Sequence, residues 1–134
     1  MANIVTTKLL LNGPRNAIVL VYLESDGATG ELDKETLVDP VVDLGLLDGA
    51  RISLEYVAYN FAGFDARLEF ASGLVDNNRK WVLSEGTNHP IDLGRFGGLY
   101  DDSTVDGTGQ LQITTIGFTS STDMGSIMLQ LRKY

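Results

Sequence analysis

The sequence predicts an all-β protein, a single-domain antiparallel β-sandwich that extends over residues 1–134. Apolar and polar residues alternate with a period of two in several short runs, as they do in strands that bury one face. Clusters of Gly, Asn, Asp and Pro separate these runs at roughly 8–12-residue intervals, a spacing typical of sandwiches and barrels. We favour a jelly-roll-like strand order and keep an immunoglobulin-like order as the alternative, because alternation does not determine which strands pair.

The N-terminal region predicts a β-hairpin. Residues 4–11 are apolar and β-branched, and residues 12–16 (Asn-Gly-Pro-Arg-Asn) have turn chemistry. Residues 17–23 are apolar throughout, so we expect a central strand that is covered on both faces. A short strand is predicted at 36–38, and the segment 41–47 is ambiguous.

Three further strands are predicted in the middle of the chain. Residues 52–56 alternate, which places Tyr56 on the apolar face of its strand. Residues 64–70 alternate between apolar and charged residues, so we expect a solvated outer face there. A short strand at 79–83 contains Trp81, the only tryptophan.

Weaker signals surround these strands. Asp48-Gly49 is a hairpin-type turn signal. Residues 85–90 are predicted to form a loop and residues 91–93 a short strand. Residues 94–109 are rich in Gly and Asp, so we expect a long loop there.

The C-terminal stretch, residues 109–134, predicts a strand, a turn and a final strand, which we interpret as a closing hairpin. The last strand runs almost to the final residue, so we expect a complete β module. Arg132 and Lys133 would discourage stray pairing if this strand lies at a sheet edge.

The charge of the chain is concentrated in one segment. The net charge is −8, and residues 24–48 contain eight acidic residues against Lys34 alone. We favour a solvated connection for this segment, with a docking face for a basic partner as the alternative. Nucleic-acid binding is disfavoured because it usually requires a basic patch.

Other classes of protein are disfavoured by composition. Without cysteine the chain has no disulfides or thiolate metal sites. No apolar stretch approaches the ~20 residues that span a bilayer, so we expect no membrane association. The N-terminus lacks the features of a secretion signal.

We predict no catalytic site and no cofactor. The only histidine, His89, lies in an Asn-His-Pro loop, and the sequence contains no nucleophile elbow to accompany it. The neighbouring carboxylates Asp101 and Asp102 would point to opposite faces of a strand, which does not suit glycoside hydrolysis. Residues 94–98 are glycine-rich but follow no phosphate-binding pattern.

Two acidic loops have residues that Ca²⁺ could use. One contains Asp101, Asp102, Ser103 and Asp106, and the other is the segment 26–33. Neither matches the EF-hand loop, and we favour ordinary Asp/Gly turns over metal sites in both. Whether the loop at 101–106 binds calcium stays open at this point.

Four aromatic residues, Tyr56, Tyr59, Phe61 and Phe64, lie close together in the sequence. They could line a sugar-binding face, but we favour core and rim positions. A carbohydrate-binding module that uses Trp81 or the tyrosines as stacking platforms is kept as an alternative.

Both ends of the chain resemble small virion proteins of tailed bacteriophages. The opening motif is Val5-Thr6-Thr7, then Leu10-Leu11, then the Asn-Gly-Pro-Arg-Asn turn at 12–16. The closing motifs are Phe96-Gly97-Gly98-Leu99, Gly107-Thr108-Gly109, Thr114-Thr115-Ile116-Gly117 and Leu131-Arg132-Lys133. The resemblance covers about half of the chain, and its motifs are structural, so no site residues carry over.

The resemblance implies a virion component, and a capsid decoration or cement protein on the outer capsid surface is the favoured expectation. Its partners would be the major capsid protein and further copies of itself, with a homotrimer favoured. A neck, tail or baseplate component is the alternative within the virion.

Overall fold

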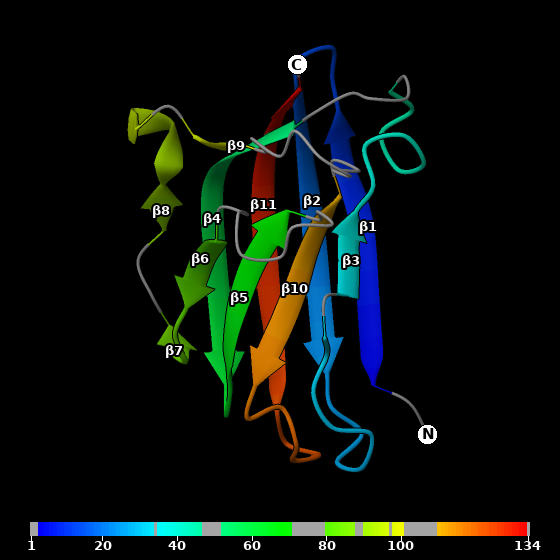
Figure 1. The fold of residues 1–134 in the computed structure, drawn as a ribbon, viewed down its shortest axis with the longest axis vertical. Coiled ribbons are helices and arrows are strands. Elements are labelled where there is room, and N and C mark those ends of the chain that lie inside the picture. The colour runs from blue at the N-terminus through cyan, green and yellow to red at the C-terminus, as the bar shows by residue number, and fades with distance from the viewer. Residues whose placement is uncertain are drawn as a thin grey trace.

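The protein is a sandwich of two antiparallel β-sheets packed face to face (Figure 1). The computed structural model describes residues 3–33, 35–46, 52–70, 80–87, 90–96, 98–100 and 110–133. The predicted all-β sandwich is confirmed. The prediction that residues 1–134 form one domain stays a prediction.

The larger sheet has the order β1-β2-β11-β4, and three short strands pair with the far side of β4. Its strands are β1 (Ile4–Asn12), β2 (Asn16–Glu24), β11 (Met124–Lys133), β4 (Ile52–Ala62), β7 (Gly86–Thr87), β8 (Ile91–Asp92) and β9 (Leu99–Tyr100). The smaller sheet has the order β3-β10-β5-β6, with β3 (Glu35–Val38), β10 (Leu111–Ile116), β5 (Asp65–Phe70) and β6 (Lys80–Leu83).

The strand order is that of a jelly roll. From β2 onward the chain passes from one sheet to the other at nearly every connection, with β5–β6 the hairpin within the smaller sheet. An immunoglobulin-like sandwich, with strands ABED in one sheet and CFG in the other, would instead keep three of its six connections within one sheet. β7, β8 and β9 follow one another along β4, so they act as one edge strand that is interrupted. The jelly-roll expectation is therefore confirmed over the immunoglobulin-like alternative.

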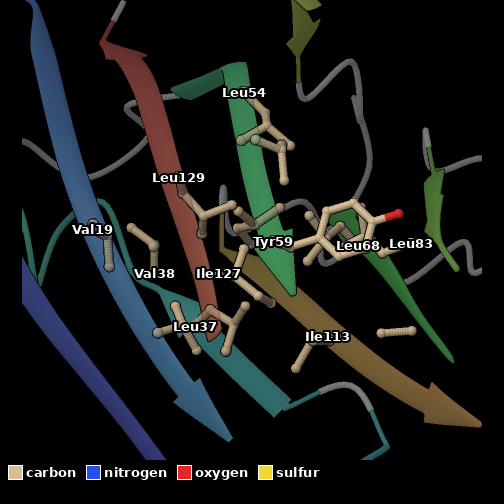
Figure 2. Packing of buried hydrophobic residues seen from close by; sticks show 14 of the residues in the cluster. Val19, Leu37, Val38, Leu54, Tyr59, Leu68, Leu83, Ile113, Ile127 and Leu129 are labelled. Carbon is tan, nitrogen blue, oxygen red and sulfur yellow. The ribbon is translucent and has the colours of Figure 1, made fainter. Parts of the chain in front are cut away.

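The core lies between the sheets and receives side chains from both (Figure 2). Val19, Ile127 and Leu129 come from the larger sheet, and Leu68 and Ile113 come from the smaller one; all five are buried. Burial of such side chains is the main favourable term in folding, at about 25 cal/mol per Å² of apolar surface.

The predicted N-terminal hairpin is confirmed, with Gly13 N–H donating to Asn16 O at 2.8 Å across the turn. A β-bulge interrupts the pairing of β1 between Leu9 and Leu11. β2 lies inside the sheet as predicted. Its outer face, however, is not covered, since Tyr22 is exposed and Leu20 is only half-buried.

Strands are also confirmed at the other well-patterned positions. In the ambiguous segment 41–47, residues 41–44 form a turn, and the N–H of Leu46 donates to Pro40 O at 3.0 Å. Sequence patterns did not predict β7 or β9, which fall in segments expected to be loops. They also did not predict the short 3-10 helix η2 (Leu93–Phe96), which begins at the last residue of the strand expected at 91–93. Asp48-Gly49 and Arg79 lie outside the described residues.

The predicted closing hairpin is wrong. β10 belongs to the smaller sheet and β11 to the larger, so residues 117–123 cross between the sheets. Within this connection, Phe118 is fully buried and packs edge-on against Phe64, with ring centroids 4.6 Å apart. The connection thus contributes a side chain to the core, which the turn of a surface hairpin would not do. β11 is also not an edge strand, because it pairs with β2 and β4.

The predicted solvated face of β5 is correct only in part. Glu69 points away from the core with Arg67 but is just 1% exposed. It lies between β10 and β6, and its Oε1 accepts a hydrogen bond from Thr114 Oγ1 at 3.3 Å. Arg67 Nε lies 3.6 Å from the same oxygen, which offsets part of the cost of burying the carboxylate.

The Phe61 and Phe64 rings pack closely against β11 at Gly125, so a substitution there tests this packing. A Cβ at this position would lie 2.5 Å from Phe61 Cδ1 and 2.9 Å from Phe64 Cζ, and both rings are buried. We expect Gly125→Ala to lower the free energy of unfolding by about 1–3 kcal/mol through overpacking, measured by urea denaturation. The neighbouring exposed change Ser126→Ala is the control and should shift it by less than about 0.5 kcal/mol. Equal effects of the two changes would contradict this packing.

Candidate binding surfaces

The edge of the larger sheet at β1 is unusually apolar. Ile4, Leu9, Leu10 and Leu11 are 41–50% exposed and together define the apolar edge. β1 is the end strand of the order β1-β2-β11-β4, so in the described structure only one of its two sides is paired. An exposed apolar edge of this length invites pairing with another chain. Lys8 and the bulge at Leu10 are the features that limit indiscriminate pairing.

Apolar residues also lie on the outer face of the larger sheet. One cross-strand row joins Lys8, Leu20, Met128 and Ala58 in register. Met128 is 41% exposed, and Leu20 and Ala58 are half-buried. The exposed apolar residues of the larger sheet are concentrated at β1, and singly exposed apolar residues on the outer face, such as Met128, need no explanation.

A second feature of the outer face begins with a β-bulge in β4. Gln130 of β11 is opposite Tyr56, whereas Leu131 is opposite Leu54, so Glu55 is the extra residue. The predicted position of Tyr56 on the apolar face is therefore wrong. The bulge reverses the alternation, so that Val57 enters the core and Tyr56 lies half-buried on the outer side.

The strand beside β4 is interrupted at the same place. β8 pairs with β4 at Tyr56 and β9 pairs with it at Ser53, and η2 lies between them. Two glycines make room here for the Glu55 carboxylate. A Cβ at Gly94 would lie 2.7 Å from Glu55 Oε2, and one at Gly98 would lie 3.2 Å from Glu55 Oε1. The bulge and the interrupted strand together position Glu55.

These elements border an open polar hollow of about 460 Å³ on the outer face of the larger sheet. Its lining contains two guanidinium groups, two carboxylates, two amides and one phenol. The lining residues are Arg15, Asn16, Glu55, Tyr56, Asp92, Gln130 and Arg132. They come from the β1–β2 turn, β2, β4, β8 and β11, which are distant in sequence. The hollow has no signature in the sequence, because alternation gives no signal for a bulge.

The aromatic residues considered for sugar stacking occupy core and rim positions, as favoured. Tyr59, Phe61 and Phe64 are buried, and the Phe61 and Phe64 rings stack with centroids 4.5 Å apart. Burial raises the pKa of Tyr59. Trp81 is half-buried against the core and borders a second, apolar hollow of about 350 Å³ with Leu93, Gly98 and Leu99. Of these aromatics, Tyr56 is the one that lines the polar hollow.

The acidic segment contains carboxylates that hold its own turns. Asp26 Oδ1 accepts hydrogen bonds from the N–H groups of Ala28 at 2.8 Å and Thr29 at 2.7 Å, and Thr29 Oγ1 donates to Asp26 Oδ2. Asp39 Oδ1 accepts from the N–H groups of Val41 and Val42. These bonds favour the solvated connection over a docking face.

Glu31 joins the same segment to β10 of the smaller sheet and to the residues that follow β10. Its Oε1 accepts hydrogen bonds from Thr115 Oγ1 at 3.0 Å and the N–H of Phe118 at 2.7 Å, and its Oε2 accepts from the N–H of Gly117 at 2.7 Å. Asp26 and Glu31, two of the three carboxylates in the segment 26–33, are thus bound by donors of the protein itself. In the described ranges, no three His, Asp or Glu side chains gather as a metal site would require.

Several residues considered as site candidates lie outside the described residues: His89, Asp101, Asp102, Ser103 and Asp106. No described residue belongs to a helix long and apolar enough to cross a bilayer. No protein-family model and no curated protein matches this sequence.

The Asp26 turn predicts a pH dependence. Hydrogen bonds from the Thr29 hydroxyl, then from the N–H groups of Thr29 and Ala28, lower the pKa of Asp26 from 3.8 to about 2. A carboxyl with a lowered pKa in the folded state stabilises the fold above its unfolded pKa, and this stabilisation is lost as pH falls toward the folded value. In chemical denaturation we expect wild type to exceed Asp26→Asn in stability above about pH 4 and to converge with it toward about pH 2. A pH-independent difference would contradict this assignment.

Proposed function

We propose that this chain is a structural protein of a tailed-phage virion, a decoration or cement protein that binds the outer capsid surface and stabilises the head. The resemblance of both chain ends to small virion proteins supports the proposal. The fold is compatible with it, since jelly rolls recur in viral capsid domains and also in lectins.

The apolar edge is the observation that carries the proposal. A monomer in water would leave Leu9, Leu10 and Leu11 at least 41% exposed beside unpaired backbone groups. Such an edge is stabilised when another chain covers it. We assign the edge to contact between copies of this chain, in a closed oligomer for which a homotrimer is favoured.

Stabilisation of a shell does not require tight binding by each copy. An oligomer that bridges neighbouring capsid subunits makes several weak contacts at once, and the linked contacts raise the overall affinity. A rigid sandwich suits this role because it loses little conformational entropy on docking.

The same features suit a neck, tail or baseplate component of the virion, and this remains the second candidate. The two differ in where the chain lies and in its copy number. A decoration protein repeats across the whole shell, whereas a neck or tail component is confined to one vertex or to the tail.

Cryo-electron microscopy of purified virions separates these functions. We expect density for this jelly roll at symmetry-related positions over the outer capsid surface, with β1 at a contact between copies. Density only at the neck or tail would favour the second candidate. The absence of the chain from the particle would overturn the proposal.

A further inference from the structure

We propose that the polar hollow on the outer face of the larger sheet binds a neutral, polyhydroxylated ligand, namely a saccharide unit. This function goes beyond capsid binding, because the hollow and the apolar edge consist of different residues.

The geometry of the hollow is the first argument. A bulge places Glu55 and Tyr56 on the outer side of β4, and the neighbouring strand is interrupted opposite them. Bulges are found beside functional sites, where they redirect side chains. Five separate segments supply the lining. Four of them are strands of the larger sheet, and the fifth is the β1–β2 turn. The volume of about 460 Å³ lies within the roughly 300–1,000 Å³ of small-molecule sites.

The hydrogen-bonding capacity of the hollow is the second argument. A sugar hydroxyl both donates and accepts, so it needs acceptors and donors side by side. The carboxylates of Glu55 and Asp92 accept, and the guanidinium groups of Arg15 and Arg132 donate. The amide of Gln130 does both. Within the described residues, none of the four charged groups has an ion-pair partner within 4.0 Å.

The balance of charge is the third argument, and it selects among ligands. Two guanidinium groups face two carboxylates, so the formal charge of the lining is zero. An anionic ligand would meet Glu55 and Asp92, and a cationic ligand would meet Arg15 and Arg132. A neutral ligand with many hydroxyl groups avoids both repulsions.

Tyr56 supplies the apolar contact that such a ligand needs. Sugars present C–H groups on the faces of their rings, and an aromatic side chain offers a flat apolar surface with a polar tip. Tyr56 is half-buried at the bulge and lines the hollow. The amide of Gln130 lies directly opposite it on β11.

The test is binding of the full chain to a panel of neutral glucose, galactose, mannose and N-acetylglucosamine oligosaccharides, followed by titration calorimetry on the members that bind. We expect at least one to bind and Tyr56→Leu and Asp92→Asn each to weaken it about tenfold or more. Val82→Thr is the matched control, because Val82 is 64% exposed on the outer face of the opposite sheet. It should bind as wild type does, and urea denaturation should give all variants similar midpoints.

The same titrations include sialylated and phosphorylated counterparts of the neutral oligosaccharides. Three outcomes would overturn the inference. They are a panel with no binding, binding that both hollow variants retain, and a preference for the sialylated or phosphorylated members over the neutral ones. The hollow variants should still decorate virions if the chain is a capsid protein. A failure of the saccharide proposal can therefore be told from a failure of the capsid proposal, because the first is read from saccharide binding and the second from binding to virions.

Discussion

The pairing of β11 between β2 and β4 is the interaction on which the rest of the structure depends. β11 is hydrogen-bonded along its length on both sides, and its inward side chains Ile127, Leu129 and Leu131 are fully buried. The pairing joins the last strand to strands from the first half of the chain. Because such contacts are non-local, we expect this sheet to form late and cooperatively in folding.

The same pairing positions both candidate surfaces. Where β11 meets β4, the slip at Gln130 and Leu131 creates the bulge that places Glu55 and Tyr56 at the hollow. Where β11 meets β2, it fixes the strand that pairs with β1 on its other side, so β1 lies at the edge of the larger sheet (Figure 1). Two surfaces of different chemistry, one apolar and one polar, thus share a single rigid sheet.

Sequence patterns predicted most of the strands and failed where a single residue changed the geometry. The alternation of residues 64–70 located β5, because a strand with one buried face has a period of two. The same reasoning misplaced Tyr56, since a bulge of one residue reverses the alternation. It also joined β10 and β11 into a hairpin, because alternation identifies a buried face but not the sheet that supplies the partner. Phe118, in the connection, is buried in the core rather than exposed in a hairpin turn. The hollow could not be predicted either, because alternation within one strand does not show which five segments come together around it.

The assignment of the apolar edge to contact between copies is the central claim, and the molar mass of the purified chain tests it most directly. Size-exclusion chromatography with light scattering should show an oligomer for wild type and for Val82→Lys, which changes an exposed apolar residue outside the edge. It should show a monomer for the double variant Leu10→Lys and Leu11→Lys, because charged side chains on an edge strand oppose pairing. A wild-type monomer at all concentrations, or an edge variant that keeps the wild-type mass, would contradict the account.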